Sequence, residues 1–173
     1  PMLSVIIERS NRESDILYAV QVFRSLGDGE ADAAEDAIQA LVTRAGAEAD
    51  GLNVADGSGL SRKDLVTPAS LAAVLRWMRT HPAAADFRRS LPEGGGAGST
   101  LRNRLDGVPV RAKTGSLLAV RCLAGYVDGP DGTPYVFVLM ANNYTTGGGR
   151  IARAQDAIVR AIAAGRRLPV DEE

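Results

Sequence analysis

The sequence has very little of what disulfides, zinc sites and histidine-based catalytic centres require. Cys122 is its one cysteine and His81 its one histidine. An internal disulfide is therefore excluded, as is a zinc site built from several cysteine and histidine ligands. A Ser-His-Asp triad is excluded as well, because His81 is followed by Pro82 at an expected helix end. We expect no metal ion and no other cofactor.

A charge excess and a long hydrophobic run are also missing. The chain has 20 Lys and Arg against 21 Asp and Glu, a formal net charge of -1. It lacks the positive field that attracts a phosphate backbone, so nucleic acid is not an expected partner. No stretch approaches the roughly 20 apolar residues of a membrane span. A chain that begins at Pro1 is expected to be a processed or cut product, so a missing export signal says nothing about its compartment.

What is present is the composition of an ordinary globular domain. The 173 residues are 45% hydrophobic and 24% charged, which is enough for one domain with its own core. We predict a single domain over 1–173. Its parts are a helical part at 1–106, a sheet with a closing helix at 107–165, and an exposed tail at 166–173.

Helical spacing of apolar residues predicts most elements of the first part. The expected helices are two within 2–27, one over 33–47, one that opens at Thr67-Pro68 and a short one over 100–105. Ser14 falls near the start of the second helix, and Thr67 is expected to cap the fourth, with Pro68 in its first position. A shaped loop at 52–62, in which Asp56 organises its own turn, lies between the third and fourth helices.

From residue 108 onward the pattern changes to one that predicts strands. The expected strands are 108–113, 120–127 and 135–142, with turns at Gly115 and at 128–132. Connections this short imply antiparallel hairpins, and a closing amphipathic helix follows the glycines at 147–149. The expected fold class is α+β, and the last strand is expected to leave an exposed edge that invites a partner strand.

Lys113-Thr114-Gly115-Ser116 is the segment with the clearest chemical meaning. In an acyl-transfer site, a lysine on a strand supplies positive charge, Thr and Ser hydroxyls bind a substrate carboxylate, and glycine admits the substrate backbone. Taken alone, the tripeptide K-T-G favours an exposed lysine beside a turn.

The surrounding segments change that interpretation. RESDILYA, DGSGLSR, LVTP, RRSLPEGG and VRAKTGSL occur in this order. Together they resemble the C-terminal half of low-molecular-mass penicillin-binding proteins of the D-Ala-D-Ala carboxypeptidase and endopeptidase family. The resemblance runs from about Leu3 to the closing helix. It implies a partial β-lactamase and penicillin-binding (transpeptidase-like) fold, an antiparallel sheet of about three strands with packed helices.

The same resemblance implies the ligands and the compartment. Peptidoglycan stem peptides or β-lactams are the expected ligands, and the expected location is periplasmic or extracytoplasmic. Members of this family work with three motifs: a helical S-x-x-K that carries the nucleophile and its lysine base, an S-x-N, and a K-T-G on a sheet edge. Only the K-T-G motif is intact in this sequence.

By position, the second motif falls on Ser14-Asp15-Ile16. The resemblance implies that Ser14 relays a proton to or from the leaving group, assisted by Lys113. A plain helix cap is an equally open role for Ser14, and the two roles are compatible. Ile16 stands where the family has the asparagine that binds the substrate amide, and its side chain offers neither a donor nor an acceptor.

Arg62 is a further candidate for substrate binding. A guanidinium pairs well with a free peptide carboxylate. A solvated arginine beside Lys63 and Asp64 is an equally open interpretation.

The sequence contains no S-x-x-K. Acylation therefore has no nucleophile in this chain, and we predict no turnover by the chain alone. The leading hypothesis is that it forms part of a serine-type D-Ala-D-Ala carboxypeptidase or endopeptidase, with a missing N-terminal half or a second copy as partner. A truncated, non-catalytic peptide-binding or structural protein is the rival. An unrelated α/β domain with a chance K-T-G ranks last.

Overall fold

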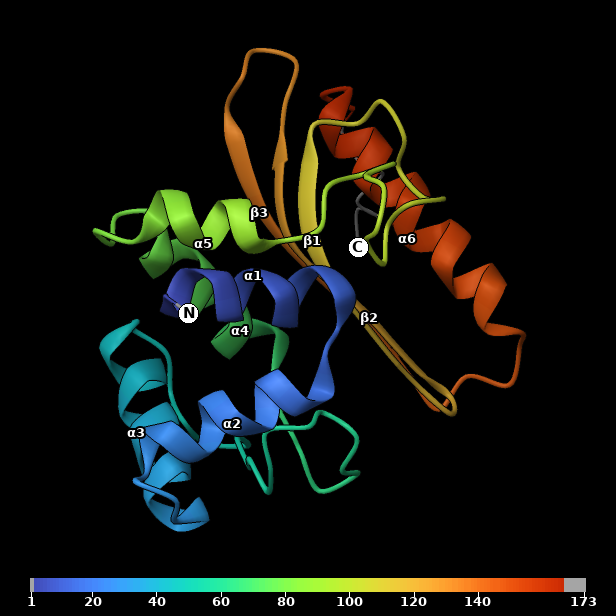
Figure 1. Ribbon diagram of the computed structural model, residues 1–173. Helices are drawn as coiled ribbons and strands as arrows, with labels where there is room; N and C mark the ends of the chain where they lie inside the picture. The colour runs from blue at the N-terminus through green and yellow to red at the C-terminus, as the bar shows by residue number, and fades with distance from the viewer. Residues whose placement is uncertain (1, 167–173) are drawn as a thin grey trace. The chain divides into compact units, whose positions relative to one another are not determined.

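The computed structural model describes residues 2–166, which form two compact units (Figure 1). The first unit, Pro1–Leu91, is helical, and the second, Pro92–Glu173, contains the sheet. The single domain over 1–173 stays a prediction. The tail expected at 166–173 lies outside the described residues except for Arg166.

The helical unit contains five helices among its described residues. They are α1 (Leu3–Glu13), α2 (Ile16–Leu26), α3 (Ala31–Arg44), α4 (Pro68–Met78) and α5 (Ala84–Ser90). The first four are confirmed predictions, whereas α5 has too little apolar periodicity to be predicted. α1 packs on α2 and α5, α2 on α3, and α3 on α4. Asn11 Nδ2 donates to Ser90 Oγ at 2.8 Å, which joins α1 to the end of α5.

Local capping chemistry sets where the helices begin. The Thr67 hydroxyl accepts a hydrogen bond from the Ser70 N–H at 3.0 Å, with Pro68 in the first turn, so the predicted cap of α4 is confirmed. Of the two roles left open for Ser14, the cap at the start of α2 is wrong. Asp15 is the N-cap of α2, because its carboxylate accepts from the Tyr18 N–H at 3.3 Å. Ser14 is instead the C-cap residue of α1.

The sheet unit contains three antiparallel strands in the order β1-β2-β3 (Figure 1). They are β1 (Val110–Leu117), β2 (Val120–Asp128) and β3 (Pro134–Asn142). The predicted α+β class with a three-stranded antiparallel sheet is confirmed. The turn expected at Gly115 is wrong. Gly115 pairs with Cys122 inside the ladder, and the chain reverses at Leu118 and Ala119.

The short helix expected over 100–105 is also wrong, because this segment consists of turns. The Gly95 N–H binds the carbonyls of Leu101 and Arg104, at 3.1 and 2.9 Å, groups that a continuing helix would use itself. Leu105 adopts φ 56°, a left-handed conformation that ends any helical run. The glycine-rich stretch before it is therefore an ordered loop of the sheet unit, held by these hydrogen bonds.

One closed core holds the sheet unit together. The helix α6 (Gly148–Ala163) contributes Val159 to a cluster of buried side chains from the strands and the preceding turns, namely Leu101, Leu105, Val110, Ala112, Leu123, Val127 and Phe137. Gln155 of α6 is buried, and its amide donates to the carbonyls of Arg121 and Leu139, at 3.2 and 3.3 Å. α6 is therefore fixed to β2 and β3 by polar as well as apolar contacts. Among the helices of residues 2–166, none has the length and apolarity to cross a bilayer.

We expect Asp156→Asn to destabilise the sheet unit. The Arg104 guanidinium contacts the Asp156 carboxylate at 2.7 Å, with both side chains largely buried. Loss of the carboxylate charge should lower the free energy of unfolding by about 1–3 kcal/mol, measured by urea denaturation followed by circular dichroism. The matched variant Asp86→Asn removes the charge from an exposed pair with Arg89 and should change it by no more than about 0.5 kcal/mol. Equal effects of the two variants would contradict the structural role of Asp156.

Candidate functional site

Lys113, Thr114, Gly115 and Ser116 all lie within β1. The sequence places them at a strand end, but the strand continues to Leu117 and only then turns. The whole segment is therefore held by the ladder that β1 forms with β2. A rigid strand positions functional groups more accurately than a loop does.

The side chains of this segment divide between the two faces of the sheet, because successive strand residues point to opposite faces. Thr114 and Ser116 share the face of the buried Ala112, which packs into the core with α6. Lys113 and Gly115 share the other face, with Ala124 and Cys122 opposite them on β2. Lysine and hydroxyl groups thus lie side by side along one strand but project from opposite faces.

The outer edge of β1 changes character along its length. At its start, Val110 O accepts from the Gly94 N–H at 3.2 Å, and the Ala112 N–H donates to Pro92 O at 2.9 Å. Because these outward bonds alternate along the strand, the N–H and C=O groups of Thr114 and Ser116 point to the same outer edge. Within residues 2–166, no strand pairs with β1 at this part of the edge.

The Lys113 side chain is partly buried. Its Nζ donates to the carbonyl oxygen of Thr114 at 2.9 Å. Burial lowers the pKa of Lys113 below the ordinary lysine value of 10.5, because the charged ammonium loses part of its hydration. The ammonium is thus held next to the K-T-G backbone and holds its proton less tightly than a solvated lysine does.

Gly115 has no steric role within the fold. A Cβ added there would meet nothing nearer than Cys122 Cβ at 3.5 Å, an ordinary van der Waals contact. Gly125 is different, because a Cβ there would lie 2.2 Å from the Arg111 carbonyl oxygen. Glycine in a strand interior weakens the strand and often marks a close approach by a ligand or another backbone. Gly115 therefore leaves open space on the Lys113 face that the fold does not use.

Ser14 and Ile16 lie at the junction of α1 and α2 in the helical unit. Ser14 is exposed, with φ 57° and ψ 45°, a left-handed conformation that costs a non-glycine residue about 1 kcal/mol. Non-glycine residues in such conformations cluster at functional sites. Ile16 begins α2 with 42% of its surface exposed, so an apolar side chain stands at the surface where the resemblance expects an amide.

The loop predicted at 52–62 is built as expected. Asp56 Oδ1 accepts hydrogen bonds from the Ser58 N–H and the Ser58 hydroxyl, at 2.6 and 2.5 Å. The bond from the Ser58 hydroxyl, followed by that from its backbone N–H, lowers the pKa of Asp56. The prediction that Asp56 organises its own turn is confirmed. Arg62 is an exposed turn residue of the same loop, and its role in substrate binding stays a prediction.

The predicted site residues thus belong to both units. Ser14, Ile16 and Arg62 lie in the helical unit, and the K-T-G segment lies in the sheet unit. The segment at 92–94, which was not predicted, covers the start of the β1 edge, and its Glu93 carboxylate contacts the Arg111 guanidinium at 2.9 Å. Pro92, which breaks any helix that would continue from Arg88-Arg89, was the available signal. Residues 2–166 contain no group of three His, Cys, Asp or Glu side chains arranged to hold a metal ion.

Comparison with known proteins identifies the same family along nearly the whole chain. The family described as "D-Ala-D-Ala carboxypeptidase 3 (S13)" matches residues 1–164. A D-alanyl-D-alanine carboxypeptidase of Actinomadura sp. strain R39 is 36% identical over 170 residues, which are 92% of this chain and 31% of that protein. The chain therefore spans about a third of the length of this curated relative. A chance K-T-G in an unrelated domain is excluded.

Solved structures show the same fold. Penicillin-binding protein 4 (dacB) from Haemophilus influenzae has a TM-score of 0.80 at 23% identity, covering 92% of this chain and 39% of that one. The TLA-3 extended-spectrum β-lactamase has a TM-score of 0.75 at 15% identity, covering 94% and 64%. At these identities the likeness shows the fold alone, and it confirms the predicted β-lactamase and penicillin-binding architecture.

We expect the Lys113 ammonium to titrate below 10.5, because burial disfavours its charged form. Lys63 and Lys113 are the two lysines of the sequence, so a Lys63→Arg variant leaves a single lysine signal for NMR titration of the side-chain Cε. The unfolded chain then binds the proton more tightly than the folded one. Stability should accordingly rise with pH from the lowered pKa of Lys113 up to 10.5. A midpoint at or above 10.5 would show that Lys113 is not desolvated.

Proposed function

Because the chain belongs to the D-Ala-D-Ala carboxypeptidase 3 (S13) family, we propose that it forms part of a serine-type D-Ala-D-Ala carboxypeptidase or endopeptidase that acts on peptidoglycan peptides. The chain spans 31% of the Actinomadura relative, so the activity belongs to the longer protein. The reaction passes through an acyl-enzyme, and a periplasmic or extracytoplasmic location follows from the substrate.

The outer edge of β1 at the K-T-G segment is the observation that most supports this proposal. The outward N–H and C=O groups of Thr114 and Ser116 can pair with the backbone of an extended peptide, which adds to the sheet as an extra strand. Gly115 leaves open space on the Lys113 face beside this edge, since a Cβ there meets only Cys122. A terminal D-Ala carboxylate or the carboxylate of a β-lactam at this edge then lies beside a strand that carries the Lys113 ammonium on one face of the sheet and the Thr114 and Ser116 hydroxyls on the other.

The site residues of this chain then supply only part of the acyl-transfer chemistry. The nucleophilic serine, supplied from outside this chain, attacks the carbonyl of the scissile peptide bond, and the acyl carbon exchanges its bond to the leaving amine for a bond to the serine oxygen. The amine leaves with a proton, and Ser14 is the proposed relay for it by its position in the second motif of the family. Lys113 supplies positive charge at the strand that binds the substrate. Water then attacks the ester, which releases the shortened peptide and restores the serine.

Two features bear on the rival hypothesis of a non-catalytic peptide-binding protein. The sequence has no S-x-x-K, and Ile16 offers no hydrogen bond to a substrate amide. Both hypotheses need the β1 edge for binding, and they differ in whether a covalent step follows. Arg62, an exposed turn residue, remains a proposed contact for a free carboxylate of the peptide.

Gly115→Ala tests the binding role of β1 without disturbing the fold. We expect the variant to be at least as stable as the native chain, because alanine fits and glycine weakens a strand interior. A diacetyl-L-lysyl-D-alanyl-D-alanine peptide should shift the Thr114 and Ser116 amide signals of the native chain in an NMR titration. The variant should bind it at least about tenfold more weakly, the factor that corresponds to roughly 1.4 kcal/mol.

Gly147→Ala is the matched control. Gly147 has φ -63° and open space around it, and it is the N-cap residue of α6, outside β1. This variant should bind the peptide as the native chain does. Unchanged binding by Gly115→Ala, or shifts in the native chain confined to residues outside β1, would refute the proposed role of the K-T-G strand.

A further inference from the structure

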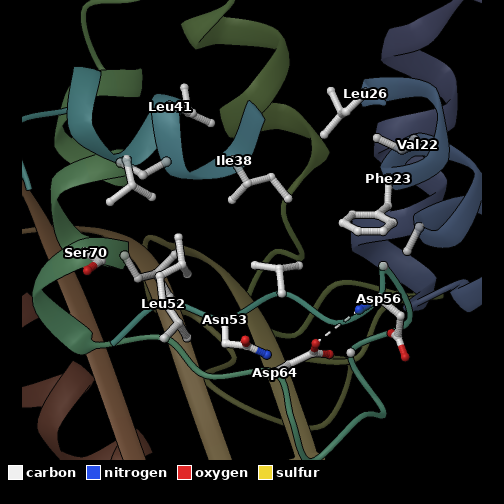
Figure 2. Close-up of a pocket in the computed structure, with 18 of the residues that line it drawn as sticks. Val22, Phe23, Leu26, Ile38, Leu41, Leu52, Asn53, Asp56, Asp64 and Ser70 are labelled. Carbon is white, nitrogen blue, oxygen red and sulfur yellow. Dashed lines mark hydrogen bonds between the residues drawn. The ribbon is translucent and has the colours of Figure 1, made fainter. Parts of the chain in front are cut away.

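Two features of the structure have no part in the proposed function. One is an apolar pocket in the helical unit, which residues such as Phe23, Leu26 and Ile38 line (Figure 2). The other lies in the sheet unit, where the guanidinium of Arg121 and the hydroxyl of Tyr144 meet at the start of α6. This second feature combines positive charge with hydrogen-bond donors, so its chemistry indicates a class of ligand.

Arg121 projects from β2 toward α6. In the ladder it stands opposite Ser116 of β1 and Ala141 of β3. Because side chains alternate along a strand, Arg121 shares the face of the buried Leu123, which packs into the core with α6. A Cβ built on Gly148 would lie 3.0 Å from Arg121 Nη2 and 3.2 Å from its Nε. The guanidinium therefore lies against the backbone of the first turn of α6.

The Arg121 guanidinium has no partner among the described residues. Its Nε is buried and makes no hydrogen bond. No carboxylate pairs with it either, because the ion pairs within residues 2–166 join other side chains. A guanidinium stays protonated in proteins, and a buried donor without a partner is unfavourable. The side chain as a whole is only partly buried, so a ligand can approach it from solvent.

The surroundings of Arg121 add positive charge and do not balance it. The start of a helix carries about half a positive charge, on N–H groups that have no partner within the helix. Gly147, the N-cap of α6, has no side chain to accept from them, and the first turn contains no acidic residue. Arg150 and Arg153 belong to the first two turns of the same helix, and neither forms an ion pair within residues 2–166.

The donors converge in a way that suits an oxyanion. The Tyr144 hydroxyl lies beside the guanidinium, 3.1 Å from the same Cβ position on Gly148. The chain passes from β3 to α6 through 143–147, which contains two threonines and ends in glycine. A glycine-containing turn between a strand and a helix start is a common arrangement for binding phosphate groups through backbone N–H groups. A guanidinium adds a fork that pairs with two oxygen atoms of a phosphate or carboxylate.

We infer that Arg121, the Tyr144 hydroxyl and the first N–H groups of α6 form a binding site for an oxyanion, a carboxylate or phosphate group. Gly148 permits this arrangement, because a side chain there would meet both the guanidinium and the hydroxyl. The site lies on the face of the sheet opposite to Lys113, and Arg121 is the ladder partner of Ser116. A carboxylate of a peptide bound along β1 and a free oxyanion are the two sources of such a ligand. The site does not depend on the acyl-transfer function.

Inorganic phosphate is the first probe, added to the full chain at constant ionic strength with chloride as the replacing anion. The Gly148 and Gly149 amide signals of the native chain should shift and saturate in an NMR titration. Arg121→Gln should weaken phosphate binding at least about tenfold, because it removes the charge and the fork. Tyr144→Phe removes one hydroxyl and should weaken binding about two- to tenfold. The melting temperature of each variant shows whether it is folded.

Arg160→Gln is the matched control, because Arg160 is an exposed arginine in the last turn of the same helix. This variant should bind phosphate as the native chain does. Equal phosphate binding by Arg121→Gln and the native chain would overturn the inference. The same holds if the Gly148 and Gly149 signals of the native chain show no saturable shift.

The diacetyl-L-lysyl-D-alanyl-D-alanine peptide and its C-terminal carboxamide distinguish the two sources of the ligand. If the peptide with the free carboxylate shifts the Gly148 signal and competes with phosphate while the carboxamide does not, the site receives the carboxylate of the substrate. If both peptides shift only the Thr114 and Ser116 signals, the site takes a free oxyanion. A native chain that binds phosphate but neither peptide supports the site and counts against the proposed function.

Discussion

The register between β1 and β2 is the constraint on which the sheet unit depends. Gly125 of β2 lies so close to the backbone of β1 that any Cβ would overlap the Arg111 carbonyl and Ala112. The ladder is thereby kept in one alignment, with Lys113 opposite Ala124 and Gly115 opposite Cys122. A slip of one residue would exchange the two faces and put Lys113 into the core.

The two units differ in how complete they are. The sheet unit has a closed apolar cluster, a buried glutamine that binds two strands, and a largely buried ion pair between Arg104 and Asp156. In the helical unit, α2 and α4 begin with side-chain caps, and the described residues of α1, α2 and α3 bury few side chains. The sheet unit therefore presents a fixed outer edge on β1, whereas the helical unit depends on contacts between neighbouring helices.

Local signals in the sequence predicted most elements. Thr67-Pro68, the apolar periods of α1 to α4 and α6, and the β-branched runs of the strands all gave the right element, because each rests on neighbours in the chain. The errors at Gly115, Ser14 and 100–105 share a cause. At Gly115 the ladder between β1 and β2 outweighed the local preference for a turn, and at Ser14 the cap formed by Asp15 took its place. At 100–105 the hydrogen bonds from Gly95 outweighed the local preference for a helix. The apolar pocket of the helical unit has no sequence signal, because apolar residues that line a pocket look like residues that fill a core.

The central claim is that this chain holds the K-T-G half of an acyl-transfer site and no nucleophile. Intact-mass spectrometry after incubation with excess benzylpenicillin tests it most directly, on this chain and on a longer form of the protein that contains an S-x-x-K segment. We predict that the longer form gains one penicilloyl adduct and that this chain gains none. An adduct on this chain would show that it has a usable nucleophile, and no adduct on either would favour a non-catalytic binding protein.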